Sequence, residues 1–276
     1  MNSSKKIKNY IGYCILFLYS ILEWERCLIP EINFPDFYNE DNFTKNLWIS
    51  VFNALVEITE PVVSFDPTNF PFITDFTNEI TNITEEYTKF NKYFWPVSYK
   101  LFDPSILEES GESGESGESG ENGESSKYDY QFVKFYGNLE NTVKWFPVLN
   151  RLLSKHTEIK TGFFSKIEGP LKIKTHRGPY RGLIRGHITI QNDTLENETC
   201  KLTILNGAEL LWKNGNSFVF DDTYYHKLDK TGNGTRTSFI FDIQRKFKSE
   251  NMNTMNDLII QSLSCSDYIQ EIREKL

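Results

Sequence analysis

Seven short runs of β-type residues in the second half of the chain constrain its fold more than any other feature. Turn residues separate the runs, as at Gly169-Pro170, Asn206-Gly207 and Asn214-Gly215. The runs cover residues 162–167, 171–175, 183–191, 200–205, 208–212, 217–220 and 237–244. Short strands with such punctuation are typical of sandwiches and jelly rolls. We therefore expect a mainly β fold with flanking helices.

A low-complexity segment divides the chain. Residues 109–126 read ESGESGESGESGENGESS and contain no apolar side chain. Such a segment cannot offset its ordering entropy by burial, so we expect a flexible acidic loop. The expected organisation is a helical or irregular N-terminal region at 1–108, the loop at 109–126, a β domain at 127–250 and a C-terminal helix at 251–276.

Apolar residues at helical spacing predict helices on both sides of this loop. The expected helices cover residues 47–60, 78–93, 139–156 and 255–275. Three prolines, Pro61, Pro67 and Pro71, interrupt the periodicity between the first two. We expect the N-terminal helices to pack on the C-terminal part.

The N-terminus carries an apolar run, residues 10–22, after three lysines. A transmembrane helix needs about 20 apolar residues, so this run is short for a span. Its length fits the apolar region of a signal peptide, but no small-residue cleavage site follows. We expect a buried helix here; membrane association through residues 10–22, as an anchor or uncleaved signal, is the alternative. The compartment stays open between the cytoplasm and a membrane such as the endoplasmic reticulum.

The charge balance argues against one class of partner. The formal net charge is -8 and the pI is near 5.2. Proteins that bind nucleic acids usually carry a basic surface. We therefore expect no nucleic-acid partner.

Three of the four histidines, His176, His187 and His226, lie in the β-rich part. Histidine is the commonest metal ligand. A jelly roll brings the ends of distant strands together, so the separation between His176 and His226 is no obstacle to a shared site. The fourth histidine, His156, ends an expected helix and is most simply a solvated residue.

Two arginines add an anion-binding character to this region. In residues 183–191, side-chain alternation places Arg185 and His187 on one face and an apolar set on the other. In residues 237–244 and the preceding Arg236, the same alternation places Arg236 with Ser238, Ile240 and Asp242, opposite an apolar face. Arginine binds carboxylates through a planar fork. A polar face inside a small β barrel favours an anionic guest, although a surface salt bridge is the simpler reading of either arginine alone.

Motifs between residues 128 and 246 resemble one known family. In chain order they are Phe164-Ser165-x-Ile167, Gly169-Pro170, His176-Arg177-Gly178-Pro179, Ile184-Arg185-Gly186-His187-Ile188, Trp212-x-x-Gly215, Phe220-Asp221-Asp222-Thr223-x-x-His226 and Arg236 to Asp242. The combined spacing resembles the aspartyl/asparaginyl β-hydroxylases. The first hundred or so residues are not covered by the resemblance.

The resemblance implies a double-stranded β-helix (jelly-roll, cupin-like) core and an oxygenase that uses Fe(II), 2-oxoglutarate and O2. It makes His176 and His226 the metal ligands and catalytic residues. It makes Ser165, Arg185, His187 and Arg236 the residues that bind 2-oxoglutarate. It places Tyr130 loosely beside the substrate.

Gly178 stands where most non-haem Fe(II) oxygenases carry a carboxylate ligand. The resembled family also lacks that carboxylate, so we expect a site with two protein ligands. We read Asp221 and Asp222 as groups that orient the loop of His226, since metal-bound histidines usually contact such partners.

The resemblance favours hydroxylation of Asp or Asn side chains in a protein or peptide. The alternatives are the same chemistry on a lipid or small molecule, and an inactive jelly-roll binding module. The intact set of histidines and arginines argues against the inactive module.

Overall fold

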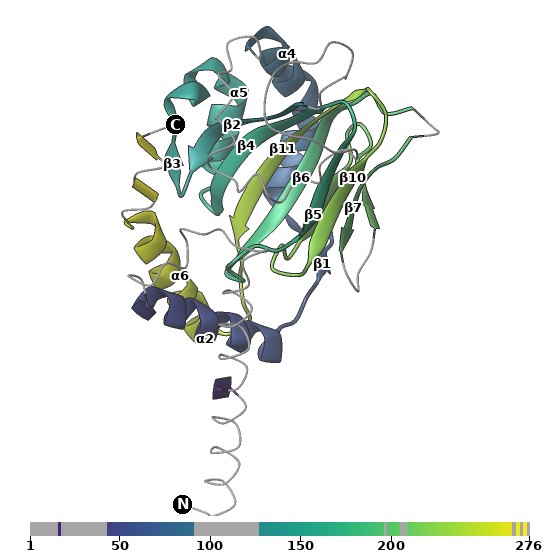
Figure 1. Cartoon of the computed structure of the whole chain (residues 1–276). Coiled ribbons are helices and arrows are strands. Elements are labelled where there is room, and N and C mark those ends of the chain that lie inside the picture. Colours follow the sequence, from purple (N-terminus) through teal and green to yellow (C-terminus); the bar gives the residue numbers. More distant parts are fainter. Residues whose placement is uncertain are drawn as a thin grey trace, which may run out of the picture.

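The computed structural model describes residues 16–17, 43–90, 127–195, 198–204, 209–266, 269–270 and 273–274. Apart from residues 16–17, the apolar run at 10–22 lies outside these residues, as does the low-complexity segment at 109–126. No helix in the described part is long and apolar enough to cross a membrane. Figure 1 shows helices flanking a curved pair of β-sheets.

Two antiparallel sheets form the core. The larger sheet has the order β1-β9-β6-β11-β4-β2-β3 and the smaller one the order β5-β10-β7-β8. The strands of the larger sheet are β1 (Ser64–Phe65), β2 (Lys127–Phe135), β3 (Asn138–Leu139), β4 (Ile159–Glu168), β6 (Leu183–Asn192), β9 (Ser217–Phe220) and β11 (Thr235–Gln244). Those of the smaller sheet are β5 (Leu171–His176), β7 (Cys200–Ile204), β8 (Glu209–Leu211) and β10 (His226–Lys230). From β4 onward the chain passes repeatedly from one sheet to the other, and only β7 and β8 follow each other within one sheet. This arrangement confirms the mainly β, jelly-roll expectation.

Side-chain alternation gives the larger sheet two different faces. Its outer face presents Ile184, Ile188, Phe239 and Phe241, which pack in one apolar cluster with the helices. Its inner face contributes Phe163 and other apolar residues to a second cluster shared with the smaller sheet. The polar residues of β6 and β11 therefore face the space between the two sheets.

Helices cover the outer face and one end of the sandwich (Figure 1). They are α2 (Phe43–Thr59), α3 (Pro71–Asn78), α4 (Ile80–Phe90), α5 (Pro147–Lys155) and α6 (Glu250–Ser264), with 3-10 turns η3 (Pro67–Asn69) and η7 (Asn141–Trp145). In a third cluster Phe52 of α2 packs 5.4 Å from the ring of Tyr180 and 5.5 Å from that of Phe247. The expected packing of the N-terminal helices on the C-terminal part is confirmed.

Two expectations, one about a helix and one about a histidine, are wrong. The helix expected at 139–156 splits into η7 and α5, because Pro147 takes the first position of α5. The helix expected at 78–93 is present as α4 (Ile80–Phe90), and residues 91–93 lie outside the described residues. His156 is buried rather than solvated: its ring nitrogens lie 2.7 Å from Asp75 Oδ2 and 2.9 Å from Glu158 Oε1.

A buried lysine makes the stability of the fold depend on pH. Lys134 of β2 is buried and donates from Nζ to the carbonyl of Leu153 in α5 at 3.0 Å. Burial lowers its pKa from 10.5 to about 8. The unfolded chain therefore binds more protons than the folded one between those two pH values, so this group's contribution to stability rises with pH across that window. Below pH 8 the buried, charged Lys134 lowers the free energy of unfolding by the full amount, about 3 kcal/mol.

Replacing Lys134 by methionine removes this term. We expect the gain in unfolding free energy of the variant over the wild type to be largest near pH 7 and to shrink by about 3 kcal/mol toward pH 10. Urea unfolding across that range measures the difference. The exposed Lys144→Met is the control for simple loss of charge. A Lys134→Met difference that does not change with pH would contradict the assignment.

Candidate active site

His176 and His226 meet at one end of the smaller sheet. His176 is the last residue of β5, His226 is the first residue of β10, and the two are paired in register across these strands. Their ring centroids lie 4.3 Å apart. The structure thus brings together two histidines that are fifty residues apart in sequence.

Both rings are held in the same way. His176 Nδ1 lies 2.8 Å from the carbonyl of Lys174, and His226 Nδ1 lies 2.8 Å from the carbonyl of Tyr224. A carbonyl only accepts, so each Nδ1 carries the proton and each Nε2 keeps its lone pair. Burial lowers the pKa of His176 to about 4, and burial together with the neighbouring His176 lowers that of His226 well below its usual value. Both imidazoles are therefore neutral at physiological pH, which is the metal-binding form.

Asp222 fills the space beside Gly178. A Cβ built on Gly178 would overlap the carboxylate of Asp222, and the Gly178 amide donates to the Asp222 carbonyl at 2.7 Å. Any side chain at position 178 would have to displace that carboxylate. In the described part of the chain, no group of three or more His, Cys, Asp or Glu side chains is arranged to hold a metal. The arrangement is that of two histidines with a carboxylate held nearby by other contacts.

Arg185 is already engaged by two carboxylates. Its Nε donates to Asp242 Oδ1 at 2.8 Å and its Nη2 to Asp242 Oδ2 at 3.2 Å, while Nη1 lies 3.2 Å from Asp222 Oδ2. Burial raises the pKa of Asp222 to about 7, although the adjacent Arg185 opposes this shift. Arg185 would have to loosen one of these pairs in order to bind an anionic guest directly.

Arg236, in contrast, has no carboxylate partner among the described residues. Its side chain is 0% exposed, and its Nη1 donates to Ser165 Oγ at 3.1 Å. The guanidinium lies over the Trp212 ring, 4.8 Å from the centroid. A fully buried cation without a counter-charge is costly, so this position favours an anionic guest.

Several polar atoms around Arg236 also lack hydrogen-bond partners. In the part of the chain that the structure describes, they are Arg236 Nε, His187 Nδ1 and Nε2, Thr189 Oγ1, Trp212 Nε1 and Ser238 Oγ. Each such buried atom costs about 1–3 kcal/mol if it stays unpaired. Burial, with Arg236 and Arg185 nearby, lowers the pKa of His187 well below its usual value. A guest rich in oxygen acceptors would satisfy the donors in this set, and the residues present therefore fit a dicarboxylate such as 2-oxoglutarate.

Two further expected residues lie at the edges of this site. Tyr130 of β2 is paired in register with Ser165 and is buried in the cluster between the sheets. Asp221 does not touch His226; its Oδ1 accepts from the Thr223 amide at 3.0 Å and from Thr223 Oγ1 at 2.6 Å. Asp221 thus shapes the turn that leads to His226.

Sequence reasoning missed the partners of these residues. Strand alternation placed Asp242 beside Arg236, but gave no sign that it would hold Arg185. The contacts of α2 with Arg181 and Tyr224 join residues more than 120 positions apart, and no local sequence pattern predicts them.

Comparisons with known proteins agree with the motifs. The model of the aspartyl/asparaginyl β-hydroxylase family matches residues 105–246, just over half of the chain. An ornithine lipid ester-linked acyl 2-hydroxylase of Rhizobium tropici is 28% identical over 118 residues, which are 40% of this chain and 38% of that protein. The chain therefore matches well under half of this relative's length.

Likenesses to solved structures are more distant. A prolyl-4-hydroxylase of Pseudomonas putida has a TM-score of 0.38 and 10% identity, covering 72% of this chain and 100% of that chain. An oxidoreductase of the 2OG-Fe(II) oxygenase family from Burkholderia pseudomallei has a TM-score of 0.32 and 13% identity, covering 45% of this chain and 71% of that chain. Likenesses this distant carry no argument about chemistry. The family match covers more than half of the chain and contains both histidines, Ser165 and both arginines. The chain therefore belongs to the aspartyl/asparaginyl β-hydroxylase family.

Proposed function

We propose that this protein is an Fe(II)- and 2-oxoglutarate-dependent dioxygenase whose metal is held by His176 and His226. The observation that carries the proposal is the histidine pair, in which both Nδ1 atoms are fixed by carbonyls and both Nε2 atoms keep their lone pairs. Between the same two sheets lies Arg236, a buried arginine that has no carboxylate partner among the described residues. A metal cation and an anionic cosubstrate would complete these two features together.

The chain's own residues would bind and orient the reactants. Arg236 and Ser165 would hold one carboxylate of 2-oxoglutarate deep between the sheets. His187 and Arg185 would face the other carboxylate nearer the metal. When bound, iron supplies the activation of O2 and the oxidation of a substrate C–H bond. The aromatic cluster between the sheets would exclude water from the reacting groups.

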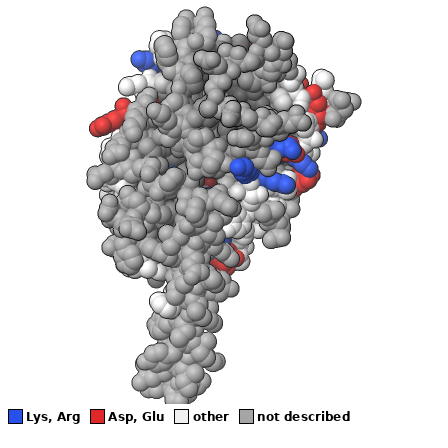
Figure 2. All heavy atoms as spheres, viewed as in Figure 1, with Lys and Arg blue, Asp and Glu red and all other residues white. Residues whose placement is uncertain are grey.

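For the substrate, we propose a protein or peptide hydroxylated on an Asp or Asn side chain, as the family's description suggests. Tyr130 would lie close to this substrate. No nucleic acid is proposed as a partner, because the chain is acidic. On the right of Figure 2, basic and acidic side chains of the described residues lie side by side.

A second substrate class has its own support. The curated relative from Rhizobium tropici is named for the 2-hydroxylation of an ester-linked acyl chain of ornithine lipid. The same iron chemistry on a lipid acyl chain is therefore the second candidate, and membrane association through residues 10–22 would suit such a substrate.

One experiment separates the two substrates. The protein is incubated with Fe(II), 2-oxoglutarate, ascorbate and O2, together with a panel of peptides that contain Asp or Asn, and separately with acyl lipids. We expect mass spectrometry to find one added oxygen atom on a peptide and none with the His226→Ala control. An added oxygen on a lipid only would replace the protein substrate with the lipid one and leave the chemistry intact.

A further inference from the structure

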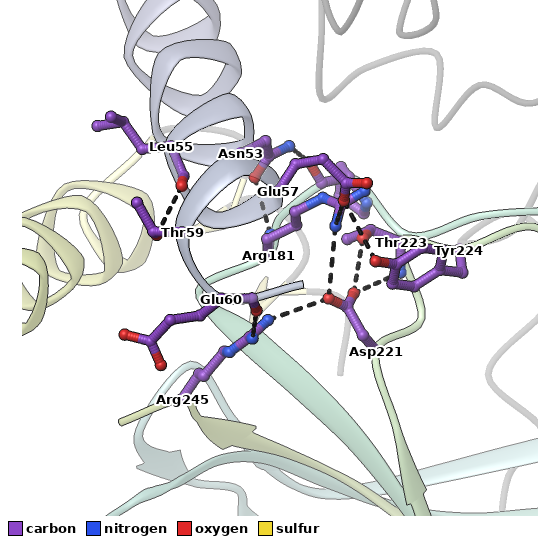
Figure 3. Close-up of polar contacts among 11 residues, drawn as sticks. Asn53, Leu55, Glu57, Thr59, Glu60, Arg181, Asp221, Thr223, Tyr224 and Arg245 are labelled. Atoms are coloured by element: carbon purple, nitrogen blue, oxygen red, sulfur yellow. Dashed lines mark hydrogen bonds and ion pairs between the residues drawn. The ribbon is translucent and has the colours of Figure 1, made fainter. Parts of the chain in front are cut away.

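A cluster of buried charges lies beneath α2. Arg181, Asp221 and Arg245 are 2%, 0% and 3% exposed. Asp221 Oδ2 lies 3.1 Å from Arg245 Nη1 and 3.9 Å from Arg181 Nη1, so two guanidiniums share one buried carboxylate (Figure 3). Such a cluster needs a second negative charge, because an uncompensated buried cation is strongly destabilising.

Glu57 of α2 supplies that charge. Its carboxylate forms an ion pair with Arg181 Nη1, and its Oε2 accepts from the Tyr224 hydroxyl at 3.2 Å. The Arg181 guanidinium also lies over the Tyr224 ring, 4.7 Å from the centroid. Figure 3 shows Arg181, from the loop between β5 and β6, lying between Glu57 of α2 and Asp221 of the loop after β9. The side chain of Tyr224 is thereby held from α2.

Tyr224 connects this cluster to the site. Its backbone carbonyl accepts from His226 Nδ1 at 2.8 Å and so fixes which nitrogen of that ring keeps a lone pair. A displacement of Tyr224 would move this carbonyl and with it the orientation of the His226 ring. Partners of this kind commonly change metal affinity about 10–100-fold when they are lost.

The His176 side is held by the same helix. Asn53 of α2 donates from Nδ2 to the Pro179 carbonyl at 2.8 Å and accepts from the Arg181 amide at 2.8 Å. Both contacts fall on the loop that follows His176. The amide of Gly178 in this loop donates to the Asp222 carbonyl, so the two loops are also joined to each other.

The segment that follows α2 also contacts the loop that leads to His226. The Val63 carbonyl accepts from the Asp221 amide at 3.0 Å, and Ser64 of β1 is paired with Phe220 at the end of β9. The Glu60 carbonyl accepts from Arg245 Nη2. The segment from Asn53 to Ser64 therefore contacts both loops through side chains and backbone, although it lies entirely outside the matched residues 105–246.

We infer that α2 and β1 are a positioning element of the active site, in which Glu57 and Asn53 fix the loops that carry His226 and His176. This inference rests on the proposed function, because it concerns the geometry of the metal ligands. Glu57 acts through Arg181 and Tyr224 and touches neither metal nor substrate. The N-terminal region is thus part of the working oxygenase.

The test is metal binding by the full chain. Mn(II) affinity is measured by calorimetry for the wild type, Glu57→Gln and Glu79→Gln. The last is a matched control, because Glu79 also pairs with an arginine, Arg151 of α5 at 2.6 Å, but it does so at the junction of α3 and α4, away from the site. We expect Glu57→Gln to weaken Mn(II) binding on the order of tenfold and Glu79→Gln to leave it unchanged.

A positioning role also predicts a change in the metal environment. Co(II) bound to Glu57→Gln should show a shifted ligand-field spectrum, whereas Co(II) bound to Glu79→Gln should match the wild type. Should Glu57→Gln fail to fold, Tyr224→Phe removes only the hydroxyl contact and keeps every charge. It should weaken Mn(II) binding in the same direction by a smaller factor.

The outcomes separate this inference from the function on which it rests. Wild-type Mn(II) binding that is lost in His176→Ala, but unchanged in folded Glu57→Gln and in Tyr224→Phe, would overturn the positioning role alone. Equal losses in Glu57→Gln and Glu79→Gln would overturn it too. A wild type that binds no metal would overturn the proposed function, and this inference with it.

Discussion

Replacing His176 or His226 by alanine is expected to lower the conversion of 2-oxoglutarate to succinate by at least about 100-fold, since even the loss of an outer partner of a metal ligand costs about 10–100-fold. The site has only these two histidines as proposed protein ligands, so the remaining one cannot hold iron firmly. Succinate formed in the absence of substrate is the quantity to measure, because it does not require the substrate to be known.

The control for this experiment is His156→Gln. His156 is also buried and bonded to carboxylates, but it lies at the end of α5, on the helical side of the larger sheet. We expect this variant to keep most of the wild-type succinate formation even if its melting temperature falls. Succinate formation at the wild-type rate in both His176→Ala and His226→Ala would show that the metal assignment is wrong.

Replacing Arg236 by alanine is expected to raise the apparent KM for 2-oxoglutarate on the order of 100-fold or more. The reason is that a buried carboxylate left without its cation loses about 3–5 kcal/mol. The apparent KM for iron should change far less, because Arg236 is bonded to Ser165 rather than to either histidine. Initial rates of succinate formation at varied 2-oxoglutarate and varied Fe(II) give both constants.

Two variants sharpen this second experiment. Arg236→Lys keeps the charge but loses the planar fork, so it should fall between the wild type and Arg236→Ala. Arg151→Ala removes an arginine whose side chain is 64% exposed in a surface pair with Glu79, and it should leave both constants unchanged. Equal effects of Arg236→Ala on the two constants would contradict its role in binding the cosubstrate.

The strands of the double-stranded β-helix were largely predictable because each carries its own period-two pattern and is bounded by turn residues. Four strands were missed: β1 and β3, which have two residues each, and β2 and β10, whose sequences hide the pattern for physical reasons. In β10, the lysines at positions 227 and 230 and Asp229 hide the alternation; Lys230 is nevertheless buried, because its Nζ donates to two backbone carbonyls. In β2, charged and aromatic residues are interleaved directly after a low-complexity segment.

The candidate site was predictable only as far as local patterns reach. Alternation correctly placed Arg185 and His187 on the inner face of β6, and Arg236 on the inner face of β11. The ion pairs and hydrogen bonds of each side chain could not be predicted, because they depend on partners that are distant in sequence. Asp242 forms an ion pair with Arg185, whereas Arg236 has no carboxylate partner among the described residues. The attachment of α2 to both loops is a tertiary contact of the same kind.

The measurement that tests the central claim most directly is an anaerobic titration of the metal-free protein with Fe(II) and 2-oxoglutarate, followed by visible absorption. Binding of 2-oxoglutarate to an Fe(II) held by the protein would produce a weak metal-to-ligand charge-transfer band. We predict that the band appears only when both are present, saturates at one equivalent of each, and is absent in His226→Ala. A wild-type protein that shows no band with both present, or a band that persists in His226→Ala, would contradict the account.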